Sequence, residues 1–174
     1  MAELVVPGVG WQESWLESMA EWGDVAQDGS GYHAELHDVQ SAEGFAAWVR
    51  YLRERSDPRT PMRAGFVHAT HWWIVEGDEY LGAITLRHSL TDKLLEGGGH
   101  IGYGVRPSAR GRGLAAWALG EVVKHAREQG LERVLVSCDD ANIASAKTIE
   151  RNGGVLEDIR ETWLGTTRRY WITT

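Results

Sequence analysis

The feature that most constrains the fold is a basic, glycine-containing loop between a short β-prone stretch and an apolar helix. It lies in "YGVRPSARGRGLAAWALGEVV", residues 103–123. Pro107 ends the β-prone stretch, because proline has no N–H for a strand ladder. The helix is predicted from about Gly113 to Gln129, with Gly130 as its stop. Its buried face is marked by apolar residues at helical spacing: Leu119, Val122, Val123 and Ala126.

The residues of this loop are of the kinds that form an anion-binding site. A helix start exposes unpaired N–H groups and the positive end of the helix dipole. Gly111 and Gly113 lack a Cβ that would keep an anion away, and Arg110 and Arg112 add positive charge although the chain carries a net charge of −7. We therefore predict a phosphate site, and the alternative is a helix start with incidental arginines.

Two common phosphate motifs do not fit the loop. The chain contains no Gly-Lys pair, which the nucleotide P-loop requires. The dinucleotide fingerprint needs a third glycine, but the pair Gly102 and Gly104 is followed by Pro107 at that position. The remaining pattern is Arg110-x-x-Gly113-x-Ala115 at the head of the helix.

The rest of the chain predicts helices first and strands later. Trp11, Trp15, Met19 and Trp22 recur at the spacing of one helical face, and a second helix is expected from Ser41 to Asp57. Later segments predict a hairpin around Gly77-Asp78 within residues 71–89, a connector at 90–99, strands at 100–105 and 133–138, a helix at 142–152, and a strand pair at 155–164 and 167–173. This order indicates one α/β (α+β) domain.

Two motifs in this order resemble the GCN5-related N-acetyltransferase (GNAT) superfamily. Arg110-x-x-Gly113-x-Ala115 is similar to its coenzyme A pyrophosphate loop, and "NIASAKTIERNGG" from Asn142 is similar to its Asn-x-x-Ala/Ser helix. The resemblance implies one domain over 1–174, with a mostly antiparallel mixed sheet, helices on both faces and two N-terminal helices. Residues 1–65 would form the acceptor side and residues 66–174 the acyl-CoA-binding core.

The resemblance also implies where acetyl-CoA would bind. Backbone amides of the loop would hold the pyrophosphate, with arginine side chains nearby: Arg110, Gly111, Arg112, Gly113, Leu114 and Ala115. The end of the preceding strand would pair with the pantetheine arm through Gly104, Val105 and Arg106. Asn142 and Ser145 would contact the cofactor from the later helix. The implied reaction is direct transfer of an acetyl group from acetyl-CoA to a primary amine.

Candidate proton-transfer groups follow from the same comparison. His100 lies near the position at which relatives carry a carboxylate base. Asp139 and Asp140 are its rivals, and they are also suited to capping the next helix or to binding a cationic acceptor. The position of the usual tyrosine acid is Ile149, which cannot donate a proton. Ser145, Cys138 or water are the substitutes. The departure at Ile149 motivates an alternative function, a CoA-binding regulator without transfer activity.

Composition limits the partners. Asp and Glu number 25 against 18 Lys and Arg, so we expect no nucleic-acid partner, and the acidic balance favours a cationic amine such as a polyamine or a lysine. We expect no membrane segment, and the single cysteine, Cys138, fits a cytoplasmic protein. The histidine pair His33 and His37 lacks a third ligand, so no metal is predicted. The acceptor, and whether the chain forms a homodimer, stay open.

Overall fold

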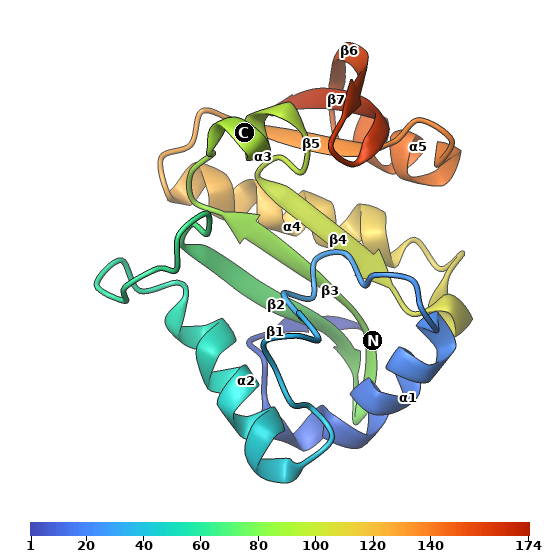
Figure 1. Ribbon diagram of the computed structural model, residues 1–174. Helices are drawn as coiled ribbons and strands as arrows, with labels where there is room; N and C mark the ends of the chain where they lie inside the picture. Colours follow the sequence, from blue (N-terminus) through green and yellow to red (C-terminus); the bar gives the residue numbers. More distant parts are fainter.

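The computed structural model describes every residue from 1 to 174. One seven-stranded sheet runs through the molecule in the order β1-β2-β3-β4-β5-β7-β6 (Figure 1). The strands are β1 (Glu3–Val5), β2 (Ala69–Glu76), β3 (Glu79–Arg87), β4 (Ile101–Val105), β5 (Arg133–Asp139), β6 (Val155–Thr162) and β7 (Gly165–Thr173). The helices are α1 (Gln12–Trp22), α2 (Ala42–Glu54), α3 (Asp92–Glu96), α4 (Leu114–Glu128) and α5 (Ile143–Arg151), with 3-10 turns η1 (Val9–Trp11) and η2 (Pro107–Ala109).

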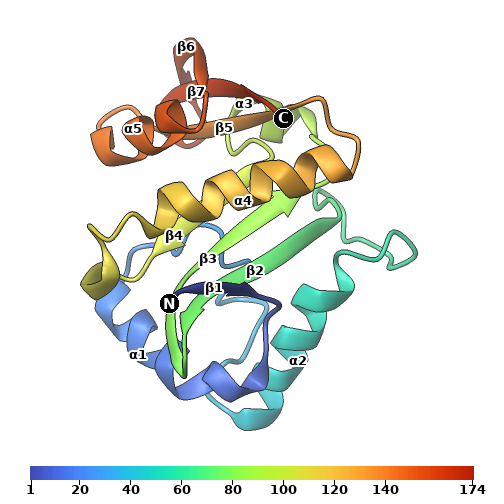
Figure 2. The same ribbon diagram turned by 180° about the vertical axis from the view of Figure 1, so that it is seen from behind.

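Helices cover both faces of the sheet. Helix α4 crosses one face, behind β3 and β4 in Figure 1 and in front of them in Figure 2, while the segment that links α1 to α2 crosses the other face. The core is accordingly divided into two apolar clusters. The cluster under α4 contains Ala118, Leu119, Val122 and Ala126 among others, and the cluster under α1 and α2 contains Trp15, Phe45, Trp48 and Trp73.

Helix α2 shows how local sequence sets these contacts. Ser41 caps its N-terminus, with the hydroxyl accepting a hydrogen bond from the N–H of Gly44 at 3.0 Å. Phe45, Trp48, Val49 and Leu52 follow at helical spacing and are all buried. One stripe of the helix therefore faces the sheet and the opposite side faces solvent.

The predicted α/β fold with a mostly antiparallel sheet is confirmed. The hairpin of β2 and β3 turns at Gly77-Asp78 as expected, and β4 and β5 form the one parallel pair. The sequence analysis assigned no strand to residues 3–5, where β1 pairs with β2. The connector expected at 90–99, for which a helical turn was one possibility, contains the short helix α3. No helix is long and apolar enough to cross a membrane.

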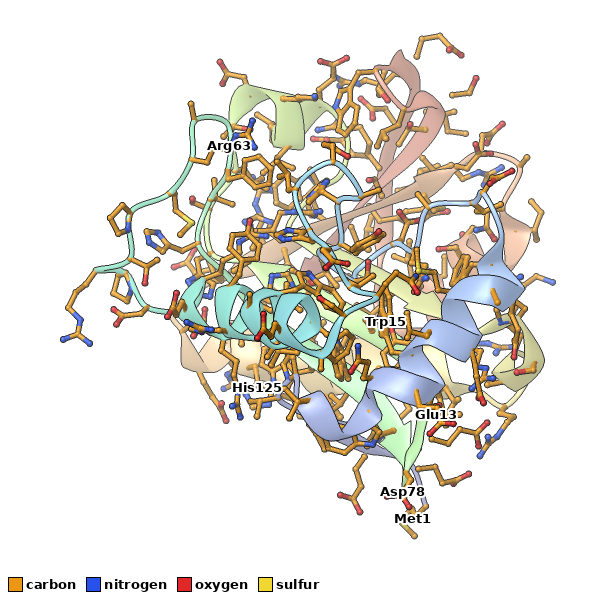
Figure 3. The ribbon with its side chains drawn as sticks, turned by 60° about the horizontal axis from the view of Figure 1, so that its bottom comes forward. Met1, Glu13, Trp15, Arg63, Asp78 and His125 are labelled. Carbon is orange, nitrogen blue, oxygen red and sulfur yellow. The ribbon has the colours of Figure 1, made fainter.

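Trp15 anchors α1 and α2 to each other. Its side chain is fully buried, and its ring lies 5.9 Å from that of Phe45 and 4.8 Å from that of Trp48, centroid to centroid. Figure 3 shows Trp15 on α1, on the side that faces α2. Burial of this ring removes a large apolar surface from water.

We predict that Trp15→Ala lowers the free energy of unfolding by about 3–5 kcal/mol, because it leaves a cavity that the packed rings cannot fill. Urea denaturation followed by circular dichroism measures this change. Trp163→Ala is the matched control, since Trp163 is 49% exposed and its loss should cost about 1 kcal/mol or less. Equal losses in the two variants would contradict the assignment of Trp15 as an anchor.

Candidate acyl-transfer site

The loop before α4 is shaped by two glycines in a left-handed conformation. Gly111 has φ +80° and Gly113 has φ +76°, values that residues with a side chain rarely adopt. A Cβ at either position would meet no atom within 4 Å, so the surrounding space is open. Gly113 is the N-cap of α4 and provides no side-chain cap. The glycines are therefore required by the backbone turn, and they leave the helix start uncovered.

The backbone N–H groups from Gly111 to Ala116 donate to no acceptor in the protein. The first bond of the turn is donated by Trp117 to the carbonyl of Gly113, at 3.0 Å. The dipole of α4, which is fifteen residues long, places partial positive charge at the same end. Unpaired donors and a positive dipole end make this loop a site for an anion.

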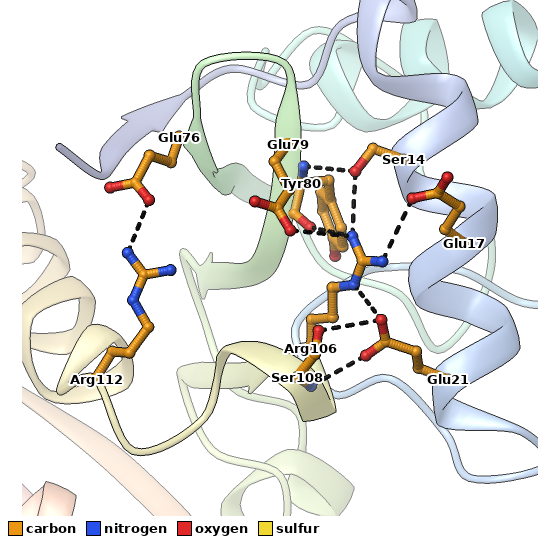
Figure 4. A network of polar contacts seen from close by, with 9 residues as sticks. All are labelled: Ser14, Glu17, Glu21, Glu76, Glu79, Tyr80, Arg106, Ser108 and Arg112. Carbon is orange, nitrogen blue, oxygen red and sulfur yellow. Dashed lines mark hydrogen bonds and ion pairs between the residues drawn. The ribbon is translucent and has the colours of Figure 1, made fainter.

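The three arginines in and before the loop, Arg106, Arg110 and Arg112, have different environments. The Nε of Arg110 donates to the carbonyl of Val105 at 3.2 Å, and the guanidinium lies 4.9 Å over the ring of Trp22. Arg112 pairs with Glu76 at 2.8 Å on the surface (Figure 4). Both side chains flank the loop and are held by weak or exposed contacts, which an anionic ligand can replace.

Arg106, in contrast, is buried in a structural network. Its Nε donates to Glu21 at 2.6 Å, and its other nitrogens lie 3.4 Å from Glu17 and 3.6 Å from Glu79 (Figure 4). Its N–H pairs with Leu81 and its carbonyl accepts from Ala109. The predicted cofactor contact from Arg106 is therefore not supported, because every one of these groups is engaged within the protein. Arg106 instead joins α1 to the end of β4.

Strand β4 has one free edge. It pairs with β3 along its whole length, but β5 contacts it at a single bridge, Ile101 with Val136. Residues on a strand point their backbone groups to alternate edges. The N–H of Arg106 donates to Leu81 of β3, and before the strand the carbonyl of His100 accepts from Arg87 of β3 while its N–H donates to Leu135 of β5. The backbone groups of Tyr103 and Val105 consequently face the open edge. Gly104, predicted to pair with the cofactor, faces β3 and has Asp28 and Trp22 packed against it.

Tyr103 and Ser145 meet across this open edge. The Tyr103 hydroxyl lies 2.6 Å from the Ser145 hydroxyl, which is on the first turn of α5. Burial raises the pKa of Tyr103, so its phenol stays protonated. Burial also raises the pKa of the nearby Cys138 thiol. The structure thus gathers neutral O–H and S–H groups on the side of β4 that faces α5.

Sequence reasoning identified Ser145 but missed Tyr103. The available signal was the alternation of Ile101, Tyr103 and Val105, which puts Tyr103 on the same face as two core residues. Asn142 caps α5 through a bond from the Ser145 N–H at 3.1 Å. Ile149 is fully buried in the core, where it packs against Gly154. The helix therefore presents Ser145, and not residue 149, to the open edge.

The contacts of His100 do not suit a catalytic base. The N–H of Leu135 donates to its Nδ1 at 2.9 Å, so the neutral ring carries its proton on Nε2. Burial, and next the positive charge of Arg87, lower the pKa of His100 to about 4. These contacts argue against His100 as the proton acceptor.

The acidic rivals of His100 also have local partners. Asp139 accepts from the N–H of Ala141 at 2.7 Å in the turn before α5, and Asp140 pairs with Arg168 at 2.6 Å. The cap of α5 is Asn142, so neither aspartate takes the capping role that was one alternative to catalysis. No group of three or more His, Cys, Asp or Glu side chains is arranged to hold a metal ion.

Comparison with known proteins agrees with this geometry. The acetyltransferase (GNAT) domain profile matches residues 12–155. No curated protein matches the sequence. An acetyltransferase of Salmonella typhimurium that modifies the N-terminal serine of 50S ribosomal subunit protein L7/L12 is 18% identical, with a TM-score of 0.66 over 99% of this chain and 95% of that one.

Two further solved structures are similar in fold. Mycobacterium smegmatis RimJ, in complex with a CoA disulfide, is 16% identical with a TM-score of 0.73, over 99% of this chain and 82% of that one. The microcin C7 self-immunity acetyltransferase MccE, in complex with acetyl-CoA and AMP, is 14% identical with a TM-score of 0.69, over 99% and 92%.

The buried, neutral state of His100 predicts a pH dependence of stability. An unfolded histidine titrates near pH 6.5, whereas folded His100 titrates at about 4, so between these values the unfolded chain binds a proton that the folded chain does not. Stability is therefore lost as the pH falls through this window. We predict a shallower loss in His100→Asn, whose amide oxygen can accept from Leu135. Parallel stability curves for the two proteins from pH 6.5 to pH 4 would contradict the assignment.

Proposed function

The chain belongs to the acetyltransferase (GNAT) domain family, and we propose that it transfers the acetyl group of acetyl-CoA to a primary amine by direct attack. The observation that carries the proposal is the uncovered N-terminus of α4 at the end of the free edge of β4. A CoA molecule needs these two features next to each other, the helix start for its anionic pyrophosphate and the strand edge for its extended pantetheine arm. The similar folds that hold CoA or acetyl-CoA support the same ligand.

The pyrophosphate would bind the N–H groups from Gly111 to Ala116. These donors are free, and the left-handed glycines leave room for phosphate oxygens to approach. Arg112 is close enough to exchange Glu76 for a phosphate. Charge-assisted bonds from a helix start and an arginine would then replace one exposed ion pair.

The pantetheine arm would pair with the open edge of β4. Its amides can bond to the backbone of Tyr103 and Val105, as an added strand does. Pairing at Val105 displaces the Nε of Arg110 from that carbonyl, which frees the guanidinium for the phosphates beside it. The thioester then lies near Ile101, where β4 leaves β5.

In the chemical step the amine nitrogen attacks the thioester carbon. The C–N bond forms, the C–S bond breaks, and the sulfur leaves with the bonding electron pair. The Ser145 hydroxyl, positioned by Tyr103, donates its proton to this sulfur and is reprotonated by solvent. The proton lost by the amine passes to water. This arrangement supplies a donor that Ile149 lacks, so the missing tyrosine on α5 does not require an inactive regulator.

Changes at the helix start test the cofactor site. We predict that Gly113→Glu removes measurable acetyl-CoA binding, because it adds a side chain and a negative charge where the pyrophosphate would lie. Isothermal titration calorimetry measures the affinity. Gly130→Glu is the matched control, since Gly130 lies at the other end of α4 with a similar φ of +84° and equally open space. Unchanged affinity in Gly113→Glu would rule out this loop.

Changes on α5 test the proton donor. We predict that Ser145→Ala lowers the single-turnover rate on the order of a hundredfold, the usual contribution of a general acid, with little effect on the Kd of acetyl-CoA. Tyr103→Phe should lower the rate less, because it removes the positioning contact and leaves the donor. Lys147→Ala, an exposed change on the same helix, is the control. A full rate in Ser145→Ala would assign protonation of the sulfur to solvent.

A further inference from the structure

Arg87, at the end of β3, has half of its guanidinium unused. Its Nη1 donates to the carbonyls of Gly98 at 3.2 Å and Gly99 at 3.0 Å. The Nε and Nη2 have no partner in the protein, and they are not sealed from solvent. These two nitrogens form one edge of the guanidinium, and that edge is the geometry that binds two oxygens of a carboxylate.

The charge of Arg87 is also not neutralised by an acid. Arg106 and Arg169, which are buried, lie 2.6 Å from Glu21 and Glu157 respectively. No carboxylate lies within ion-pair distance of Arg87, nor of its neighbour Arg55, which is 5% exposed, donates to the carbonyl of Val67 and has an unpaired Nε. Proteins rarely keep such charges unpaired, because desolvation without an anion is costly. Two arginines in this state indicate that an anion binds here.

This edge lies at the place where the proposed reaction occurs. A Cβ on Gly102 would lie 3.8 Å from the Nη2 of Arg87, and the N–H of Arg87 donates to the carbonyl of His100. Gly102 directly follows Ile101, the residue at which β4 leaves β5. An anion on Arg87 would therefore sit beside the thioester and on the acceptor side of the strand.

The loop between α1 and α2, which packs on the same part of β4, carries a carboxylate close enough to Arg87 to interact with its charge. Gly29 of this loop packs on the backbone of Gly102, and its carbonyl accepts from the Thr85 hydroxyl at 2.6 Å. The neighbouring Asp28 keeps contact with solvent, yet the protein around it raises its pKa, an effect that the charge of Arg87 partly offsets. Asp28 and Arg87 thus influence each other without forming an ion pair. Asp28 is thus a negative group suited to an ammonium, and Arg87 is a positive group suited to a carboxylate.

We propose that the acceptor carries a carboxylate close to the amine that is acetylated, as an amino acid does, with the carboxylate on Arg87 and the amine beside Asp28. This proposal rests on the proposed acetyl transfer and narrows its acceptor class. It differs from the polyamine or lysine that the acidic composition favours. The reason is that the acceptor would contact the charges of Arg87 and Asp28, whereas the net charge belongs to the whole chain. The carboxylate can belong to a free amino acid or to an acidic peptide.

The experiment compares acceptors that differ in one charge. Release of CoA is measured with free amino acids including β-alanine, with their methyl esters, and with peptides that have glutamate or glutamine next to the N-terminus. We expect kcat/KM to be at least about tenfold higher for acids than for their esters, as for a charge-assisted pair. A preference among the peptides for glutamate, with free amino acids inactive, would place the carboxylate on a peptide.

Variants link the preference to this arginine. Arg87→Gln should raise the KM of the acids at least tenfold and leave that of the esters unchanged, and Arg87→Lys should restore part of the preference and guard against misfolding. Arg63→Gln is the control. Arg63 is exposed on the loop between α2 and β2 (Figure 3), and its replacement also removes one positive charge.

Equal use of acids and esters, or a preference that survives in Arg87→Gln, overturns the proposal while acetyl transfer stands. If no amine is acetylated, the carboxylate site is tested by the thermal stabilisation that the acids give to the protein in the presence of CoA. Stabilisation by the acids, lost in Arg87→Gln, supports a carboxylate site. The absence of stabilisation by every acid overturns it. Failure of acetyl-CoA itself to bind would contradict the proposed function and is measured separately.

Discussion

The arrangement of the site depends on one constraint, that β4 is paired along one edge only. Strand β3 lies in register with all five residues of β4, whereas β5 reaches β4 only at the bridge of Ile101 and Val136 and pairs along its length with β7. Unpaired backbone groups on a strand edge bind another extended chain. The free edge begins beside Arg87, passes Tyr103 and Ser145, and ends at the start of α4. The sites proposed for the pyrophosphate, the proton donor and the acceptor are therefore neighbours in space.

The Arg106 network keeps this edge in position. Its guanidinium connects carboxylates on α1 with the β2–β3 hairpin, and Glu21 also accepts from the N–H of Ser108 at 3.0 Å. Burial alone would raise the pKa of Glu21, but the hydrogen bonds from Ser108 and Arg106 lower it overall. Helix α1 is consequently held to η2 by the contacts of Glu21, and to α2 by the aromatic contacts of Trp15. Both contacts fix the helices at the two ends of the loop from α1 to α2, which lies on the proposed acceptor side.

The sequence predicted those structural features whose physical cause lies within a few residues. Pro107 and the glycines of the loop before α4 act within a few residues, so the loop and the helix start followed from them directly. The roles of Arg106 and His100 could not be read in this way. Arg106 pairs with Glu21, 85 residues earlier, and His100 accepts from a strand that begins 33 residues later. Tyr103 was equally hidden, because its partner Ser145 becomes a neighbour only when α5 packs beside β4.

Backbone amide chemical shifts in a titration with acetyl-CoA test the central claim most directly. If the free edge and the helix start hold the cofactor, the largest changes occur at Gly111 to Ala116, with further changes at Tyr103 and Val105. The helix end near Gly130 should not respond. The account is contradicted if these amides stay unchanged while the shifts gather elsewhere, for example around the surface hollow lined by Arg133, Arg160 and Arg169.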